Sequence, residues 1–445
     1  MFPERVELED GLNLLLLQAH PTEAEEVPVA QADGRVLAED IISKENIPPF
    51  DRSPYDGYAL IAADTVHASQ DTPVSLKVIE EVPAGYAPVH RLNPGQAIKI
   101  LTGAPVPSGA TAIVKYEDTN FTEKEVTIFS PCREGSNIVP LGEDVREGEL
   151  VVEKGRLISP ALVGLMAGLG YERVRVYRRL SAVLLSTGDE LVPIGATLQP
   201  GKIRNSSIYT IASYLERWGV KASMLGIEKD QAQRIAEKIR EGLSDHDFII
   251  TTGGVSVGDY DMVLEALKIL EAKILFWKVK MKPGMAFVGA LWKGKFILAL
   301  SGNPSAAAVS LFMLGKPLIQ KMAGMKEYAT EEIRVKMLDD FPKKSPSRRF
   351  LPGTLEIVDG EAWIRFARKQ GNGMLNPLRD CEILGEIKAG SPPMTKGSII
   401  RAYRFFMNQR VSVCGIADCI NALFPHGKQR SDGIRRFVPM VAVYK

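Results

Sequence analysis

The stretch Phe248-Ile-Ile-Thr-Thr-Gly-Gly-Val-Ser-Val-Gly-Asp-Tyr-Asp261 indicates a buried strand that ends in a glycine-rich, acidic loop. Its first five residues are apolar or β-branched, which is typical of a central strand in a parallel sheet. Paired glycines let the backbone approach an anion, and carboxylates such as Asp259 and Asp261 suit a hard cation such as Mg²⁺. The loop therefore predicts a phosphate and metal site at the carboxyl edge of a sheet. An ordinary glycine-rich turn with solvated acids is the alternative.

The sequence around this loop alternates between strand and helix patterns. We predict strands over 182–185, 221–227, 248–252, 274–279 and 296–300, and helices over 207–218, 231–243, 260–270 and 304–322. Strands and helices that alternate at this spacing form right-handed βαβ units and a mainly parallel sheet. Residues 179–326 are therefore predicted to form an α/β domain with a ligand site at its strand ends.

The rest of the chain divides into β-rich and helical parts. Residues 47–147 and 327–405 carry short β-branched runs separated by Gly and Pro, which predicts two small β domains. Residues 1–46 carry a helical pattern, including Val29 to Leu37, and we expect them to pack with residues 148–178 as one discontinuous N-terminal domain. The 445-residue chain is thus predicted to be a multidomain α/β plus β protein.

Composition excludes several classes of function. The formal net charge is +1, so the chain lacks the basic footprint of a nucleic-acid-binding protein. The longest weakly polar stretch, residues 158–170, is too short to span a bilayer, and the acidic amino terminus shows no signal-peptide pattern. We therefore expect a cytoplasmic protein with no membrane and no nucleic-acid partner. The cysteines and histidines show no metal-binding spacing.

Two other predicted strand ends carry similar residues. Ser186-Thr-Gly-Asp-Glu-Leu191 would place Asp189 and Glu190 at the same sheet edge as Asp261. Ser301-Gly-Asn-Pro304 opens a long helix whose N-terminal amides are able to hold a phosphate, although a plain helix cap explains it equally well. The candidate substrate-binding residues of these three loops are Ser186, Thr187, Gly188, Gly253, Gly254, Ser256, Gly258, Ser301, Gly302, Asn303 and Pro304.

The first predicted β domain holds polar residues in tight turns. Pro49–Ala59 contains Asp56, Leu101–Pro107 contains Thr102, and Gly142–Val145 contains Asp144. Each turn alone is compatible with a solvated surface loop. In order along the chain, however, these turns and the strand-end loops resemble the molybdopterin molybdenumtransferase family, the MoeA proteins, a family also found as the C-terminal part of gephyrin. Met281-Lys-Pro-Gly284 belongs to the same series of motifs, and the resemblance covers residues 1–405.

The resemblance implies an enzyme that takes adenylylated molybdopterin and molybdate, cleaves the phosphoanhydride in a Mg²⁺-dependent step and releases AMP. It implies a three-layer molybdopterin-binding α/β domain, and a homodimer whose cleft is partly supplied by the second protomer. Other proteins of molybdenum cofactor biosynthesis would be further partners. The catalytic positions carried over are Asp56, Thr102, Asp144, Glu190, Asp230 and Asp261, with Glu190 and Asp261 assigned to the metal. Lys278 and Lys282 are carried over as cationic substrate contacts.

The chain departs from the family pattern around the implied oxyanion pocket. Members usually have Lys-Pro-Gly-Lys-Pro where this chain has Lys282-Pro-Gly-Met-Ala286, so Met285 replaces a lysine and Ala286 a proline. Pro352 stands where members often have an arginine, and Asn372 replaces a customary serine. A tetrahedral dianion held by charge-assisted hydrogen bonds would be bound less tightly without these groups. Molybdate and tungstate both stay open as the oxyanion.

Two other functions stay open. The same α/β domain occurs in CinA-type proteins, which would make the chain a nucleotide pyrophosphatase, and gephyrin shows a non-catalytic scaffold built on the same fold. The β domain with Asp56-Gly-Tyr-Ala59 argues against the first alternative. The acids Glu190 and Asp261 favour an enzyme over the second.

The tail of residues 406–445 carries a second, weaker resemblance. Val411 to Asp418 looks like the opening strand of a MobB-type nucleotide-binding adapter. A P-loop would need Gly and Lys at the places of Ile420 and Asn421. We therefore predict a degenerate remnant that does not bind GTP.

Overall fold

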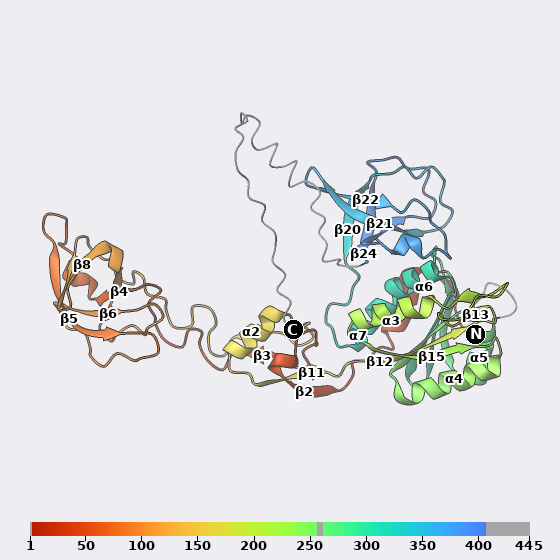
Figure 1. Cartoon of the computed structure of the whole chain (residues 1–445), viewed down its shortest axis with the longest axis horizontal. Coiled ribbons are helices and arrows are strands. Elements are labelled where there is room, and N and C mark those ends of the chain that lie inside the picture. The colour runs from red at the N-terminus through yellow and green to blue at the C-terminus, as the bar shows by residue number, and fades with distance from the viewer. Residues whose placement is uncertain (1, 256–260, 406–445) are drawn as a thin grey trace.

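The computed structural model describes residues 2–255 and 261–405. Ser256, Gly258 and the MobB-like tail of residues 406–445 lie outside the described residues. Figure 1 shows an elongated arrangement with a six-stranded sheet at one end and a seven-stranded sheet with its helices at the other. A small linking module lies between them, and a closed β barrel lies beside the helices of the larger sheet. No helix in the described ranges combines the length and apolar character that a bilayer crossing needs.

The seven-stranded sheet is the central layer of the α/β domain. Its strands are β1 (Glu4–Val6), β12 (Ser181–Thr187), β15 (Lys221–Glu228), β16 (Phe248–Thr252), β17 (Lys273–Val279), β18 (Phe287–Trp292) and β19 (Lys295–Leu300). They lie in the order β1-β17-β18-β19-β16-β12-β15. Strands β19, β16, β12 and β15 are parallel, whereas β18 runs antiparallel to both of its neighbours. The sheet is mainly parallel, and the predicted α/β plus β fold is confirmed.

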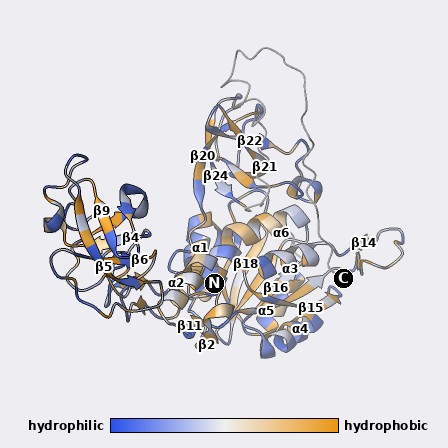
Figure 2. Ribbon diagram, turned by 60° about the vertical axis from the view of Figure 1, so that its left-hand side comes forward, coloured by the Kyte–Doolittle hydropathy of each residue, from blue (hydrophilic) through white to orange (hydrophobic). Residues whose placement is uncertain are grey.

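Helices cover both faces of this sheet. They are α1 (Leu8–Leu16), α3 (Ser207–Arg217), α4 (Ala232–Asp245), α5 (Met262–Ile269), α6 (Pro304–Ser310) and α7 (Lys316–Met322), with the π-helical turn η4 (Leu311–Gly315) joining the last two. Helices α1, α3, α6 and α7 share a core with Phe248 and Leu298. Helices α4 and α5 share the other core with the next residues along the same strands, Ile249 and Ile297. Each strand thus fills both cores, and Figure 2 shows these apolar strands between the helices.

The amino-terminal segment differs from its prediction. Strand β1 pairs in parallel with β17, and Leu8 and Leu15 of α1 are buried in the core of the α/β domain. Residues 4–16 therefore pack with the α/β domain and not with the N-terminal domain to which the sequence assigned them. A helix of nine residues is too short to be stable alone, so it lies where the largest core covers its apolar face.

One local prediction is wrong, and one strand was missed. Within Val29 to Leu37, the expected helical pattern forms only the 3-10 turn η1 (Val29–Gln31). Strand β18 was not predicted, and it pairs with β17 and β19 in the middle of the sheet. Its Gly289 is needed for packing, because a Cβ atom there would lie 2.8 Å from Leu15 and 2.9 Å from Phe276. Glycine is uncommon inside strands, so Gly289 weakens the strand pattern in the sequence although packing requires it.

Two distant segments form the linking module. It contains β2 (Ala24–Pro28), β3 (Ile41–Ile42), β10 (Leu150–Val152), β11 (Arg173–Tyr177) and α2 (Pro160–Gly168). Strand β2 pairs with β11 and β3 pairs with β10. Leu37 and Ile41 from the first segment share a core with Met166 and Val174 from the second.

The two remaining units are built of strands. The six-stranded sheet contains β4 (Gly57–Leu60), β5 (Val74–Val82), β6 (Gln96–Ile100), β7 (Ala112–Lys115), β8 (Thr119–Phe121) and β9 (Glu125–Ile128), with 3-10 turns η2 (Ala62–Thr65) and η3 (Tyr116–Asp118). The barrel contains β20 (Glu332–Met337), β21 (Arg349–Val358), β22 (Glu361–Phe366), β23 (Ile383–Ile387) and β24 (Ile399–Arg404), with the turn η5 (Asn376–Leu378). Each of these units has its own apolar core.

An ion pair between Arg178 and Asp247 connects the segment before β12 to the segment before β16. The carboxylate of Asp247, just before β16, accepts hydrogen bonds of 2.7 and 3.1 Å from the Arg178 guanidinium. It also accepts hydrogen bonds from the amide and hydroxyl of Ser181, the first residue of β12. Burial alone raises the pKa of Asp247, but these hydrogen bonds outweigh burial and hold the pKa below its ordinary value.

Asp247→Asn should lower the free energy of unfolding at pH 7 by about 1.5–3 kcal/mol, the usual contribution of hydrogen bonds to a charged group. Because the folded pKa is depressed, this stability is present above the unfolded pKa and is lost as the pH falls through the folded pKa. Urea unfolding followed by tryptophan fluorescence measures it, since Trp218, Trp277 and Trp292 lie in this domain. The difference between variant and parent should shrink below about pH 4. A difference that is constant with pH would contradict the ionic assignment.

Candidate active site

Three strand-end loops meet at the carboxyl edge of the seven-stranded sheet. Strands β12, β16 and β19 are parallel neighbours, so the loops that follow them lie side by side. The amide of Gly253, after β16, donates a 3.1 Å hydrogen bond to the carbonyl of Leu300 at the end of β19. A Cβ atom on Gly302 would lie 3.3 Å from the Cα of Gly253. The segments that the sequence singled out are therefore neighbours in space.

Glycines are required where the β16 loop meets the β12 loop. Gly253 has a φ of +91° and Gly254 a φ of +63°. A Cβ atom on Gly253 would lie 2.1 Å from the carbonyl oxygen of Thr187, and one on Gly254 would lie 2.8 Å from the Thr187 hydroxyl. Any side chain here would push the two loops apart.

Buried hydroxyl groups line the floor of this edge. The Ser186 hydroxyl hydrogen-bonds to Thr252 at 2.9 Å and to Asn205 at 3.1 Å. The Thr187 hydroxyl is buried and has no hydrogen-bond partner among the described residues. Buried polar groups are nearly always paired, so this hydroxyl is suited to a ligand that occupies the edge.

Acidic residues crowd together beside these loops. Asp189 and Glu190 follow β12 and are exposed, and Asp230 follows β15. Partial desolvation raises the pKa of Asp230, and the nearby charges of Glu190 and Asp189 raise it further, against a lowering hydrogen bond from the Asp189 amide. Crowded carboxylates favour a cation beside them. Within the described ranges, however, no group of three or more acidic, histidine or cysteine side chains is arranged to hold a metal ion.

Asp261 has a structural contact at the next strand end. It is the N-cap of α5, and its Oδ1 accepts a 3.1 Å hydrogen bond from the Leu264 amide. The cap fixes the direction in which the acidic loop enters the helix. Asp261 therefore holds the start of α5 as well as carrying a charge near the sheet edge.

The amides at the N-terminus of α6 have partners within the protein. The amides of Ser305 and Ala306 point at the carbonyl of Asn372, at 3.1 and 3.4 Å, and not at an open site. The amide of Asn303 bonds to the hydroxyl of Ser301. These three amides are used within the protein and are not free for a phosphate. The segment still contributes through the contact between Gly302 and Gly253.

The two lysines that were predicted to contact the substrate, Lys278 and Lys282, lie in different surroundings. Lys278 is the last residue but one of β17. It has a φ of +66°, is only 7% exposed, and places its ammonium 3.6 Å from the centre of the Trp277 ring. Strand β17 runs in the same direction as β19, so Lys278 lies at the same sheet edge as the acids. Lys282 lies in a loop that is bound to the barrel through its backbone amide and carbonyl.

A cavity of about 290 Å³ lies between the α/β domain and the barrel. Lys282 and Ser305 line it from one side, and Arg349, Pro352 and Asn372 from the other. Two positions that depart from the family pattern, Pro352 and Asn372, thus face the same cavity as Lys282. Met285 does not line it.

Sequence reasoning missed Arg349. Its side chain lines the cavity, and its Nε donates a 3.1 Å hydrogen bond to the Ser345 hydroxyl. The hydrogen bonds from the Lys282 amide to Arg348 and from the Phe350 amide to Lys282, both 2.9 Å, hold Arg349 and Lys282 side by side. The available signal was the adjacent pair Arg348 and Arg349, because paired guanidinium groups suit an oxyanion.

The polar residues of the first β unit form a second group. Asp56 Oδ1 accepts hydrogen bonds from the Thr102 amide, at 2.7 Å, and the Thr102 hydroxyl, at 2.8 Å. These hydrogen bonds hold the pKa of Asp56 below its ordinary value. Asp144 is exposed on the segment that returns to the linking module. Figure 1 shows the six-stranded sheet at the opposite end of the molecule from the seven-stranded sheet, whose strand-end loops carry the acids, so one chain does not bring the two groups together.

Comparisons with known proteins assign most of the described chain. Residues 6–170 match the MoeA N-terminal region (domain I and II), residues 183–321 match the probable molybdopterin binding domain, and residues 334–405 match the MoeA C-terminal region (domain IV). A molybdopterin molybdenumtransferase of Staphylococcus epidermidis is 37% identical over 318 residues, which cover 72% of this chain and 76% of that protein. One from Staphylococcus aureus is 35% identical over 359 residues, or 81% and 86%.

Solved structures agree with the sequence matches. The molybdopterin biosynthesis MoeA protein of Pyrococcus horikoshii OT3 superposes with a TM-score of 0.78 at 29% identity, over 90% of this chain and 100% of that chain. A molybdenum cofactor biosynthesis protein from Pyrococcus furiosus, at 16% identity and a TM-score of 0.55, shares the fold over 90% of this chain.

Proposed function

The chain belongs to the MoeA family of molybdopterin molybdenumtransferases, and we propose that it transfers molybdenum from molybdate to adenylylated molybdopterin with release of AMP. Membership makes it an enzyme of molybdenum cofactor biosynthesis that acts on a molybdopterin substrate. The observation that carries the proposal is the meeting of Gly253, the buried Thr187 hydroxyl and the crowded acids at one sheet edge. Such an edge is where open α/β sheets bind ligands.

The two alternatives are not favoured. The family match over residues 6–170 includes the six-stranded sheet, a unit that the CinA-like pyrophosphatase alternative does not need. The contact between Asp56 and Thr102 orients a charged group on an exposed surface, which a scaffold does not require. The acids at the strand ends of the α/β domain also favour an enzyme over a scaffold.

The acids fit a bound Mg²⁺. This ion usually takes one or two protein carboxylates and completes its shell with water and substrate phosphate oxygens, so a protein cluster of three ligands is not needed. Glu190 and Asp261 would hold it, with Asp230 beside Glu190. When bound, Mg²⁺ supplies charge neutralisation for the phosphoanhydride. The protein itself orients the substrate through the Gly253 loop and excludes water with the buried floor formed by Ser186 and Thr187.

We further propose that the working enzyme is a homodimer with its site shared between protomers. Asp56 and Thr102 lie beside β4 and β6 of the six-stranded sheet, at one end of the molecule, and Asp144 lies next to Val145 of the linking-module core. Glu190 and Asp261 lie in loops of the α/β domain, toward the other end. A two-fold dimer places the same two surfaces together twice, so it completes two sites at once. The charged turn of Asp56 in one protomer would then face the acidic strand ends of the other.

The cavity around Lys282 is the proposed oxyanion pocket. Lys282 and Arg349 provide two cations, and the Ser305 hydroxyl adds a neutral donor. Arg349 thus offers the cavity a guanidinium although position 352 is a proline. Charged donors are the strong partners of a tetrahedral dianion such as molybdate or tungstate. Their presence supports oxyanion binding in this chain.

The proposed function is tested with purified protein, adenylylated molybdopterin and Mg²⁺. Addition of molybdate or tungstate should start AMP release and formation of the metal-loaded dithiolene, and the concentration series for each oxyanion shows which is preferred. AMP release that needs no oxyanion and leaves no metal on the product would instead favour the pyrophosphatase alternative. Binding without turnover would favour the scaffold.

Arg349→Gln should raise the molybdate concentration for half-maximal insertion by about 10-fold or more, since it removes one hydrogen bond to a charged group. Titration of molybdate against product formation measures the midpoint. Arg334→Gln is the matched control, because Arg334 is an exposed arginine on β20 of the same barrel. Its midpoint should equal that of the parent.

The departures from the family pattern supply the converse experiment. Pro352→Arg adds a cation to the cavity and should lower the midpoint, whereas Met285→Lys should change it little, because Met285 does not line the cavity. Equal midpoints in the parent, Arg349→Gln and Pro352→Arg proteins would place the oxyanion site elsewhere.

A further inference from the structure

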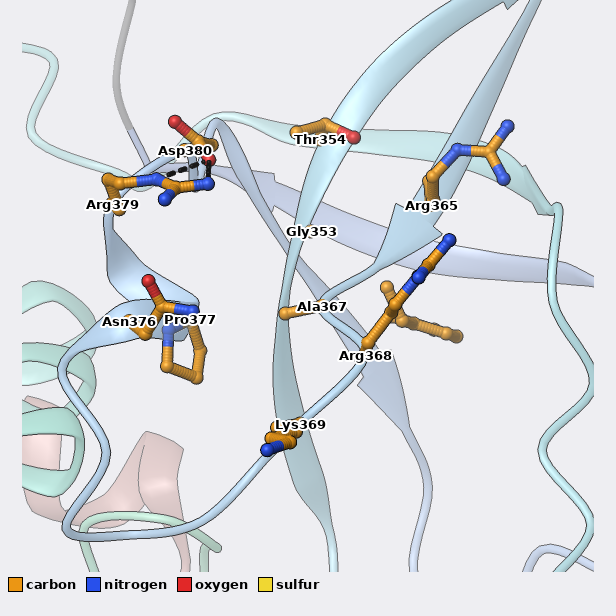
Figure 3. A pocket seen from close by; sticks show the side chains of 11 residues that line it. Gly353, Thr354, Arg365, Ala367, Arg368, Lys369, Asn376, Pro377, Arg379 and Asp380 are labelled. Carbon is orange, nitrogen blue, oxygen red and sulfur yellow. Dashed lines mark hydrogen bonds and ion pairs between the residues drawn. The ribbon is translucent and has the colours of Figure 1, made fainter.

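A second and larger cavity lies in the barrel domain. Its volume is about 540 Å³, and it is formed by the middle of β21, the end of β22 with the residues that follow it, and η5 with the two residues after it. Figure 3 shows Arg365 and Arg368 on one side of this cavity and Arg379 with Asp380 on the other. It shares only Pro377 with the cavity that holds Lys282. Its volume is typical of a site for a small organic ligand.

The cavity carries an excess of positive charge. Four cations line it, Arg365, Arg368, Lys369 and Arg379, together with one acid, Asp380. Asp380 pairs with Arg379, and Arg365 pairs with Glu356 on the neighbouring strand. Arg368 and Lys369 form no ion pair or side-chain hydrogen bond with any residue in the described ranges. Two charges are therefore left for a ligand.

The fold holds these charges close to one another. Arg365 lies directly opposite Thr354 in the antiparallel pairing of β21 and β22. The neighbouring Gly353 cannot carry a side chain, because a Cβ atom would lie 2.7 Å from the Arg365 carbonyl and 2.6 Å from Ile364. In Figure 3 the guanidinium of Arg368 points toward that of Arg365. Arg365 has Glu356 as a counter-charge, whereas Arg368 and Lys369 have none, so the excess positive charge favours an anion beside them.

We propose that this cavity binds a tetrahedral dianion, either free phosphate or the phosphate group of a small monoester. Guanidinium groups match phosphate oxygens with paired hydrogen bonds, and Lys369 adds a compact third charge. The Thr354 hydroxyl is a further donor at the same wall. This site is separate from the molybdenum chemistry and does not depend on the proposed function.

Calorimetric titration of the full chain with inorganic phosphate, at constant ionic strength, tests the proposal. The double variant Arg368→Gln, Lys369→Gln should weaken phosphate binding by about 10-fold or more, since it removes two charged donors. Both side chains are exposed, so the barrel should keep its fold, which circular dichroism checks. The matched control Lys388→Gln, Lys396→Gln removes the same charge from elsewhere on the barrel and should bind as the parent does.

Two further arms separate the possible sources and sites. AMP that binds more tightly than phosphate, with the same loss in the Arg368 and Lys369 variant, identifies a monoester as the ligand. Equal affinities identify the free oxyanion. Repeating the titrations in the Lys282→Gln background keeps the other cavity out of the comparison, and the loss in the Arg368 and Lys369 variant should persist there. The proposal is overturned if phosphate does not bind to the parent, or if the control variant loses as much affinity as the cavity variant.

Discussion

Replacement of Glu190 by glutamine should lower the rate of AMP release from adenylylated molybdopterin by about 10²-fold or more, the usual effect of removing one preorganised charge from a reacting centre. Glutamine keeps the size of the side chain and removes its charge. Because Glu190 is exposed at a strand end, the substitution should leave the melting temperature unchanged. The measurement is single-turnover AMP release in excess Mg²⁺. Binding of the substrate should fall much less than the rate.

Two companion variants make the result specific. Asp261→Asn removes the other proposed metal carboxylate but keeps the cap of α5, because asparagine caps a helix as well as aspartate does. It should therefore lose activity without loss of stability. Glu237→Gln changes an exposed acid on α4 and should be fully active. Turnover close to that of the parent in both Glu190→Gln and Asp261→Asn would refute the assignment of these acids.

The strand-end loops show what the sequence was able to predict. All residues of Phe248–Thr252 are apolar or β-branched, which indicates a strand. The two glycines that follow indicate the loop where this strand ends. A buried parallel strand leaves such a local signature, because both of its faces need apolar residues. The loops after β12 and β19 were predicted to lie at the same edge because the carboxyl ends of parallel strands share one edge of a sheet.

Features that depend on contacts between distant residues were not predictable in this way. The place of α1 is decided by the core of a domain that begins more than a hundred residues later. The sequence leaves the amides at the start of α6 available for a phosphate, but in the structure two of them donate hydrogen bonds to the carbonyl of Asn372. Arg349 becomes a candidate binding residue only because backbone hydrogen bonds place it beside Lys282.

The separation of the two polar groups has a consequence for activity. A sequence motif gives the residues of a site but not the chain that supplies each of them. Asp56 and Glu190 belong to opposite ends of one elongated protomer. If the site is shared, damage to one end in one protomer and to the other end in its partner leaves one complete site in every mixed dimer.

A mixed dimer of Asp56→Asn and Glu190→Gln protomers should therefore have about half of the parent's activity, although each variant alone is nearly inactive. Asparagine at position 56 still accepts the hydrogen bonds from Thr102, so the turn should keep its shape while losing its charge. Co-expression with two different affinity tags and sequential purification isolates the mixed dimer. AMP release by this dimer is then compared with that of each variant dimer and of the parent, prepared with the same tags.

The outcome distinguishes the two possible arrangements because the second site of the mixed dimer carries both substitutions. With a shared site, one intact and one doubly damaged site coexist, and activity returns. If each site is formed within one chain, every site carries one substitution. The mixed dimer is then as inactive as the two variant dimers. Failure to recover any protein carrying both tags would contradict the homodimer itself. Recovery of activity would show that the exposed Asp56 turn acts on the acids of the opposite protomer, which no contact within one chain provides.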